Sequence, residues 1–217
     1  MKEMEKTIVI VMIMVLCFSA SDVKALILDD GGIHTIDYQL DDNVWVEDSP
    51  LDELTTLNIV DDGIIRDWVN VLDYSQVNMS GGSIGSGLLT WDNSQSVITG
   101  GLIASDIYAF GDSYIEIYGS MIEDILNVRD NSLVEIYGSN FAVDGIPVGY
   151  GEITVGTINE LGMLTGTLTG TLDSGELINN AFNIDPDATI ILVPEPASVL
   201  FIITGIFFLR KKKKYKL

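Results

Sequence analysis

The sequence predicts an all-β protein: a right-handed parallel β-helix with coils of about 19 residues, flanked by an N-terminal signal helix and a C-terminal transmembrane helix. Three observations predict this fold. The middle of the chain contains a gapless 19-residue repeat, and each repeat alternates apolar and polar residues. Both chain ends combine a short apolar segment with charged residues. Together these features indicate a repetitive exported domain with two processing segments.

Four segments of the middle region align at a constant spacing of 19 residues. A fixed period of this size is the sequence signature of a solenoid, in which each repeat buries its apolar face only against its neighbours. Glycine, serine and aliphatic residues recur in register. The columns are Gly81, Gly100, Gly119 and Gly138; Ser75, Ser94, Ser113 and Ser132; Met79, Ile98, Ile117 and Ile136; Ile84, Ile103, Ile122 and Phe141; Val77, Ser96, Ile115 and Val134; and Leu88, Ile107 and Leu126.

Within each repeat the apolar columns alternate with polar positions, as in Ile115-x-Ile117. A period of two indicates short strands with one buried face, and the Gly, Ser, Asn and Asp residues between them indicate turns. Three short strands and three turns fit one coil of a parallel β-helix. A β-sandwich also has alternating strands, but it does not produce a constant gapless spacing, so the solenoid is the favoured fold.

The repeats and the flanking composition divide the chain into five parts. We expect a signal peptide at 1–25, an N-terminal cap at 26–60, β-helix repeats at 61–149, a C-terminal β cap at 150–193 and a sorting segment at 194–217.

The N-terminus has the order of segments that is typical of a secretory signal peptide. Charged residues in Met1–Lys6 precede an apolar run, Thr7–Phe18, and small residues follow, with Val23–Ala25 as a cleavage site. The single cysteine, Cys17, lies inside the apolar run, so we expect a mature protein without disulfides.

The C-terminus contains a Pro-Glu-Pro motif, an apolar segment and a basic cluster. Pro194 and Pro196 interrupt any preceding element, so the apolar segment 197–209 starts afresh. That segment is about 20 Å long as a helix, shorter than a full bilayer span. The cluster that follows is typical of the cytoplasmic side of a membrane, where it acts as a stop-transfer signal. Its members are Arg210, Lys211, Lys212, Lys213 and Lys214.

This tripartite tail resembles the PEP-CTERM sorting signal of exported proteins in Gram-negative bacteria, although its basic cluster has lysine where the family usually has arginine. The resemblance covers about 25 residues. It implies recognition by exosortase, an integral-membrane enzyme, with Pro194, Glu195 and Pro196 as a substrate motif. It also implies a precursor anchored transiently in the inner membrane and a mature product at the cell surface or outside the cell. The glycine-rich repeats resemble, more loosely, β-helical repeats of other PEP-CTERM proteins.

Charge limits the partners of the middle region. Of the 11 basic residues only Arg66 and Arg129 lie within 26–209, against 29 of the 32 acidic residues, so this part carries 2 − 29 = −27. Such a field repels phosphate backbones, so we expect no nucleic-acid binding.

No residue pattern supports a catalytic site. Between Ser75 and Val148 the only cation is Arg129. The single histidine, His34, lies in the expected N-terminal cap, isolated from Ser or Cys partners. Glu116 and Glu135 share a column, so they stack about 5 Å apart, near the separation of a retaining glycosidase pair. Both alternate with inward aliphatic residues, which places them on a flat outward surface as solvated carboxylates. We expect no catalytic residues and no cofactor.

Two outward aromatic columns are candidate glycan-binding residues: Tyr118 with Tyr137, and Trp91 with Phe110. Aromatic rings on a flat β surface can hold sugar rings, but stacked rings also stabilise neighbouring strands. Turn residues Asp92, Asn93, Asp112, Asp130 and Asn131 offer oxygen atoms to calcium. The repeats lack the spacing of calcium-binding glycine-rich repeats, so we expect no metal site.

The sequence therefore favours a noncatalytic, envelope-sorted surface or extracellular-matrix protein, with exosortase, the membrane and exopolysaccharide as partners. The alternative is a carbohydrate-active enzyme, a glycoside hydrolase or lyase, on a β-helix scaffold. A calcium-stabilised solenoid is a third interpretation.

Overall fold

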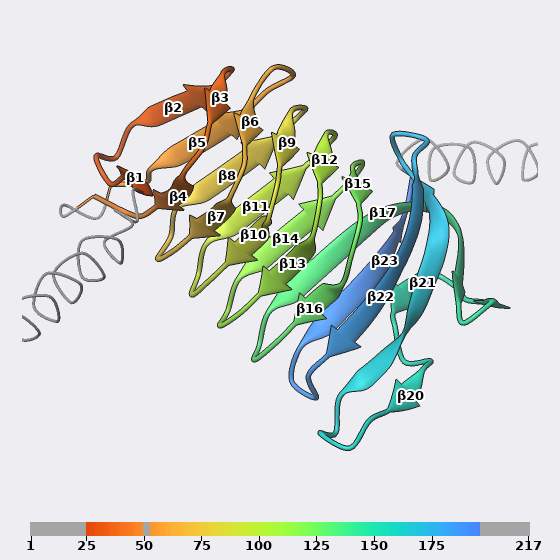
Figure 1. Ribbon diagram of the computed structural model, residues 1–217. Coiled ribbons are helices and arrows are strands. Elements are labelled where there is room, and N and C mark those ends of the chain that lie inside the picture. Colours follow the sequence, from red (N-terminus) through yellow and green to blue (C-terminus); the bar gives the residue numbers. More distant parts are fainter. Residues whose placement is uncertain (1–24, 50–52, 196–217) are drawn as a thin grey trace, which may run out of the picture.

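The protein is a β-solenoid, described here by a computed structural model that covers residues 25–49 and 53–195 (Figure 1). Every regular element in these residues is a strand. Successive coils stack into about six layers, and their strands form ladders that run along the solenoid axis (Figure 1). The predicted all-β repeat architecture is therefore confirmed.

Three parallel ladders make up the coils. The first contains β2 (Ile33–Ile36), β5 (Thr56–Ile59), β8 (Gln76–Met79), β11 (Gln95–Ile98), β14 (Tyr114–Ile117) and β17 (Leu133–Val143). The second contains β3 (Gln39–Leu40), β6 (Ile64–Ile65), β9 (Ser83–Ile84), β12 (Leu102–Ile103) and β15 (Met121–Ile122). The third contains β1 (Ala25–Leu28), β4 (Asn43–Val46), β7 (Trp68–Val71), β10 (Gly87–Thr90), β13 (Asp106–Ala109) and β16 (Leu126–Val128).

The strand register reproduces the repeat in the sequence. In the first ladder Gln76 pairs with Gln95, Gln95 with Tyr114, and Tyr114 with Leu133, which is a step of 19 residues each time. The earlier coils are longer: Ile33 pairs with Thr56, a step of 23. Residues 26–60, expected as an N-terminal cap, thus supply the strands β1 to β5 of the first coils. Their variable loop lengths break the period, which is why the repeat is faint there.

The core is a set of stacked aliphatic columns between the ladders. In the first ladder the strands bury alternate residues, and the partners of each pair occupy the same depth. Parallel pairing places these side chains directly above one another, so apolar surface is buried coil by coil. The fully enclosed members include Val77, Met79, Ile98, Ile115, Ile117, Val134 and Ile136 from the first ladder, Ile65, Ile84 and Ile103 from the second, and Val69, Leu88, Ile107 and Leu126 from the third.

The serine column closes the turn between the third and first ladders. Each serine N–H donates to the carbonyl three residues earlier, and the hydroxyls of Ser75, Ser94 and Ser132 donate to the same carbonyl and to one in the preceding coil. The residue after that carbonyl has a left-handed backbone in four successive coils. Aspartate and glycine tolerate this conformation, and they occupy it as Asp73, Asp92, Gly111 and Asp130.

The C-terminal region closes the solenoid with longer strands. β17 continues straight through Gly138, where the earlier coils turn, and pairs antiparallel with β21 (Leu164–Leu172). β21 forms a hairpin with β22 (Leu177–Ile184), which adds to the third ladder beside β16. β23 (Thr189–Pro194) adds to the first ladder beside β17. Three short strands complete this end: β18 (Ile146–Pro147), β19 (Gly151–Glu152) and β20 (Thr157–Ile158).

The second ladder ends at β15, and a side chain completes its hydrogen bonding. In earlier coils the carbonyls of Ile65, Ile84 and Ile103 each accept a backbone N–H from the next coil. The corresponding carbonyl of Ile122 has no further coil below it. Instead the buried amide of Asn180 donates to Ile122 at 2.8 Å and to Asp124 at 2.6 Å. Asn180 thereby satisfies the carbonyl of Ile122, which would otherwise be buried without a partner.

The two segments predicted to enter a membrane fall outside the described residues: the signal peptide except for Ala25, and the apolar segment with its basic cluster. In the part of the chain that the structure describes, there is no helix with the length and apolar character needed to cross a membrane.

We predict that Asn180→Ala lowers the free energy of unfolding by about 1–3 kcal/mol, because it leaves the buried carbonyl of Ile122 without a donor. The measurement is the urea midpoint of the variant against the wild type. Asn179→Ala is the matched control, since Asn179 lies next to Asn180 on β22 and is exposed; it is expected to change stability by less than about 0.5 kcal/mol. Equal midpoints for the two variants would contradict the role of Asn180.

Candidate functional site

Two outward surfaces of the solenoid gather aromatic and polar side chains, one on the first ladder and one on the third. On the first ladder, Glu116 of β14 and Glu135 of β17 are register partners. Both are partly exposed and flanked by buried aliphatic residues, as the sequence predicted. The two glutamates lie on the outward side of the ladder, beside Tyr114 on β14 and Tyr137 on β17.

Three tyrosine hydroxyls converge on this carboxylate pair. Tyr114 donates to Oε2 of Glu135 at 2.7 Å, and Tyr137 donates to the same oxygen at 2.6 Å. Tyr118 donates to Oε1 of Glu116 at 3.1 Å, and the Tyr137 hydroxyl lies 3.2 Å from that oxygen. Hydrogen bonds to a charged acceptor are stronger than neutral ones, so the hydroxyls offset the repulsion between the two stacked carboxylates.

The same arrangement affects the tyrosines. Burial, together with the hydrogen bond to Glu135, raises the pKa of Tyr137 and of Tyr114 far above the ordinary value. Burial also raises the pKa of Tyr118. A hydroxyl that donates to a carboxylate is held in its protonated form, since ionisation would place a third negative charge in the cluster.

The tyrosine rings stack as the shared column predicts. The centroids of Tyr118 and Tyr137 are 4.0 Å apart with 14° between the planes. The turn between β21 and β22 binds the backbone of these two tyrosines: the N–H of Asp173 donates to the Tyr137 carbonyl and the N–H of Ser174 to the Tyr118 carbonyl. Sugar binding by this pair stays a prediction.

The surface of the third ladder holds a larger aromatic cluster. Trp91 and Phe110 stack with centroids 4.0 Å apart and 13° between the planes. The ring of Tyr108 in β13 lies 5.7 Å from that of Phe110, which directly follows β13, and the two planes are nearly parallel; the ring of Trp68 in β7 lies 6.3 Å from that of Tyr108. Four rings from three coils are therefore in contact on one surface, which we call the tryptophan surface.

The 19-residue repeat predicts only half of this cluster. Trp91 and Phe110 occupy the same repeat position and so form a column. Tyr108 lies two residues before Phe110, so the period of two places it on the same side of β13. Trp68 shares its column with Gly87 and Asp106, and no aromatic repeats there. The alternation within β7 was the pattern that could have placed Trp68 outward.

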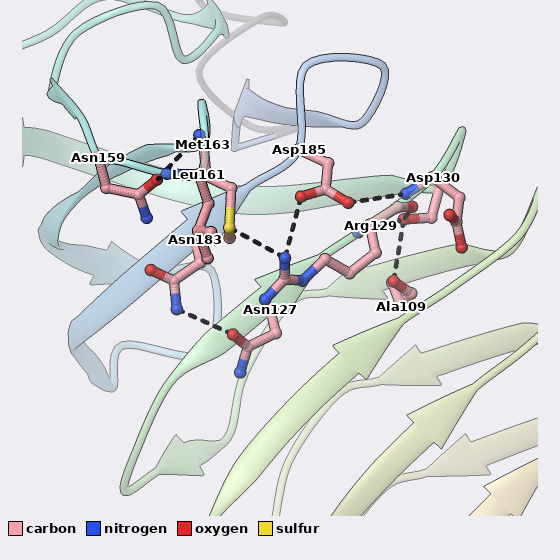
Figure 2. A network of polar contacts seen from close by, with 10 residues as sticks. Ala109, Asn127, Arg129, Asp130, Asn159, Leu161, Met163, Asn183 and Asp185 are labelled. Carbon is pink, nitrogen blue, oxygen red and sulfur yellow. Dashed lines mark hydrogen bonds and ion pairs between the residues drawn. The ribbon is translucent and has the colours of Figure 1, made fainter.

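Arg129 extends the column of Trp91 and Phe110 by one coil and joins the solenoid to its C-terminal closure (Figure 2). Its Nη1 donates to Oδ1 of Asp185 at 3.0 Å and to Sδ of Met163 at 2.9 Å. Beside it, Nδ2 of Asn183 donates to Oδ1 of Asn127 at 2.9 Å (Figure 2). Arg129 thus forms an ion pair that links the last coils to the C-terminal closure.

Four of the remaining candidate residues, Asp112, Asp130, Asn131 and His34, have polar partners within the fold. Nδ2 of Asn131 donates to Oδ1 of Asp112 at 3.1 Å, and Oδ2 of Asp130 accepts the N–H of Gly111 at 3.0 Å. Nε2 of His34 lies 2.7 Å from Oδ1 of Asp30, a contact that lowers the pKa of Asp30. Within 25–49 and 53–195, no group of three or more His, Cys, Asp or Glu side chains is arranged to hold a metal ion.

The Pro-Glu-Pro motif, predicted to be a sorting signal, begins inside the folded domain. Pro194 is the last residue of β23 and is the register partner of Gly138. The next residue, Glu195, accepts a hydrogen bond at Oε1 from the Ser139 hydroxyl at 3.0 Å. Pro196 and the basic cluster that begins at Arg210 lie outside the described residues. Two of the three motif residues are therefore attached to the last coil.

Comparisons of the chain with protein-family models, with curated proteins and with solved structures return no match. Its function is therefore argued from its own residues.

The tyrosine–carboxylate cluster predicts a loss of stability at alkaline pH. The folded-state pKa values are raised, so above the ordinary tyrosine value of about 10 the unfolded chain releases protons that the folded chain retains. This contribution is complete below pH 10 and is lost as the pH rises beyond it. Urea unfolding of wild type and Tyr137→Phe between about pH 8 and 11 measures it, and the variant is expected to show the shallower decline.

The control for this experiment is Tyr38→Phe, which removes a hydroxyl from an exposed ring and leaves the cluster intact. It is expected to follow the wild-type profile. A Tyr137→Phe profile as steep as that of the wild type would show that the cluster does not govern the alkaline transition.

Proposed function

We propose that this chain is an exported, envelope-sorted, noncatalytic surface or extracellular-matrix protein that is processed by exosortase and associates with exopolysaccharide. The observation that carries the proposal is the order of the C-terminal segments: Pro194-Glu195-Pro196, a short apolar segment and a basic cluster. With the signal peptide at 1–25, these segments describe a chain that is exported, held in the inner membrane and then released to the cell surface or beyond.

The position of the motif supports a processing role. Because Pro194 and Glu195 close the last coil, a cut after them separates the apolar and basic segments from an otherwise complete solenoid. The span of about 20 Å suits a temporary anchor better than a permanent one.

The hydrogen bonds and the ion pair formed by Glu116, Glu135 and Arg129 support a noncatalytic role. A glycoside hydrolase needs one carboxyl group as an acid and another as a nucleophile or base. Here Glu116 and Glu135 both accept tyrosine hydroxyls on an open ladder surface. A lyase needs a free base or cation near the sugar, whereas Arg129 is bound to Asp185.

The proposal also includes the handedness of the coils and a helix at each end of the chain. Parallel strands joined by crossover connections are right-handed in nearly all known cases, which supports right-handed winding of the coils. The apolar runs at 7–18 and 197–209 support a signal helix and a transmembrane helix at the two ends.

The sorting proposal predicts that Glu195→Gln blocks processing. Glutamine keeps an oxygen that can accept the Ser139 hydroxyl, so the last coil is retained while the charge of the motif is lost. We expect an unprocessed, membrane-retained form, measured by the intact mass and membrane fractionation of the protein from its native host.

Ser139→Ala is the matched control, because it removes the hydrogen bond to Glu195 and leaves the motif unchanged. It is expected to give the wild-type mature mass. Identical mass and location for wild type and Glu195→Gln would refute the proposal.

The noncatalytic proposal is tested with the carboxylate pair. The wild type and Glu116→Gln/Glu135→Gln are incubated with neutral and acidic polysaccharides, and chain length is followed by size-exclusion chromatography. We expect no shortening by either protein. Reproducible depolymerisation that the double substitution abolishes would establish the alternative, a glycoside hydrolase or lyase.

A further inference from the structure

Exposed apolar side chains are concentrated at the C-terminal end of the solenoid, where β17, β21 and β23 close the last coil (Figure 1). Within residues 75–143, which the structure describes throughout, Met121 is the only large apolar side chain that is exposed. The first coils expose several, spread over 27–74. The much shorter segment 144–163, which joins β17 to β21, exposes five: Ile146, Tyr150, Val155, Ile158 and Leu161. Such a concentration of apolar surface marks a contact site.

Three of these five residues belong to one patch around β18 and β19. Two adjoining hollows in the surface share Pro147, Val148 and Tyr150 as lining residues. Ile146 precedes Pro147 on β18, and Val155 lines the second hollow. The exposed fractions are 59% for Ile146, 53% for Tyr150 and 40% for Val155. These five residues, Ile146, Pro147, Val148, Tyr150 and Val155, are called the apolar patch below.

The apolar patch is attached to the solenoid through two strands of the first ladder. β18 pairs antiparallel with β17, and Gly151 of β19 pairs with Leu192 of β23. The ring of Tyr150 lies 6.4 Å from that of the buried Phe141, at an angle of 88° between the planes. The patch is therefore a fixed part of the closing end of the solenoid.

The chain leaves the described part of the fold beside the apolar patch. Leu192, which lines the second hollow, lies two residues before Pro194. Ser139, which donates its hydroxyl to Glu195, directly precedes Asn140, which lines the first hollow. Two residues of a strand span about 7 Å, so the hollows begin within about that distance of the sorting motif.

The sequence leaves almost no linker between this end of the fold and the predicted membrane segment. Pro196 alone separates Glu195 from the apolar segment 197–209. One residue spans at most about 3.6 Å, and the headgroup layer on each side of a bilayer is roughly 5–8 Å thick. Insertion of 197–209 into a bilayer therefore holds the C-terminal end of the solenoid at the lipid headgroups.

The composition of the apolar patch suits a lipid surface. Tyrosine is enriched at membrane interfaces, because its ring is apolar and its hydroxyl stays hydrated. Residues 26–209 carry −27, and this field opposes attraction to anionic lipids. Contact with a bilayer therefore depends on burial of apolar side chains and is best made with zwitterionic lipid.

We propose that the apolar patch contacts the bilayer surface while the tail anchors the precursor, with Ile146, Tyr150 and Val155 among the headgroups. The inference rests on the transient anchor of the proposed function and adds an orientation to it: the C-terminal end of the solenoid faces the membrane. In this orientation the Pro-Glu-Pro motif lies at the membrane surface, within reach of an integral-membrane enzyme.

The test measures which positions of the anchored protein touch lipid. The full chain carries Cys17→Ser, which removes the only natural cysteine. It is produced in a bacterium without exosortase and reconstituted in phosphatidylcholine vesicles, and intact mass verifies that the signal peptide is removed and the tail retained. A fluorophore is attached at Val155→Cys or at Asp62→Cys, and quenching by lipids with a nitroxide on the headgroup is recorded.

The two label positions differ in their distance from the proposed contact. Asp62 is exposed in the turn after β5, which is four strand steps from β17, or about 19 Å along the ladder. We expect strong quenching at Val155→Cys and none at Asp62→Cys.

A substitution within the patch separates lipid contact from anchoring. Ile146→Asp/Tyr150→Asp places two carboxylates where contact with lipid requires their dehydration, so quenching at Val155→Cys is expected to be lost while the protein stays with the vesicles. Ile64→Asp is the matched control, because it changes an exposed isoleucine of β6 outside the patch, and it is expected to retain the quenching. Equal urea midpoints of wild type and the double variant exclude unfolding as the cause.

Equal quenching at the two label positions, or quenching that the double substitution leaves unchanged, would overturn the inference. Vesicle-bound protein without quenching at Val155→Cys would also overturn it, and would indicate that a second copy or the apolar segment covers the patch. Protein that does not stay with the vesicles would overturn the transient anchor as well, so the two failures are distinguishable.

Discussion

Parallel backbone pairing between successive coils is the constraint on which the rest of the structure depends. It holds each residue of a coil about 4.8 Å from the residue at the same place in the next coil. The residues of one column therefore contact one another, and each column must hold residue types for which this contact is tolerable. Aliphatic residues do so by burying surface, and Ser75 and Ser94 do so by donating hydroxyls to neighbouring carbonyls. Glu116 above Glu135 is the unfavourable case, and it is stabilised by tyrosine hydroxyls.

A stack held in this way has ends whose backbone groups need partners. At the C-terminal end the fold changes from coils to long strands, and β21, β22 and β23 cover the last layer. Where no strand covers the second ladder, Asn180 supplies the donors. The same closure ties Pro194 and Glu195 to β17, so the proposed sorting motif is continuous with the folded domain and is not carried on a separate linker.

The two aromatic surfaces show that residue type and ring spacing do not by themselves define a binding site. Both contain a stacked pair at 4.0 Å, and the backbone spacing of the coils accounts for both. They differ in their surroundings. The tyrosines are bound to carboxylates, whereas the indole of Trp68 packs against Gly87 of the next coil and approaches Tyr108.

The sequence by itself determined the solenoid, the inward columns and the stacking of Trp91 on Phe110, because a gapless repeat converts position in the chain directly into position in space. It did not determine the coils within 26–60, where insertions such as the 23-residue step from Ile33 to Thr56 hide the period. Nor did it place Trp68 beside Tyr108, pair Arg129 with Asp185, or bring Asn180 to Ile122. These contacts join residues outside the repeated columns, and only the tertiary structure decided them, because they depend on how side chains and closing strands fill space between coils.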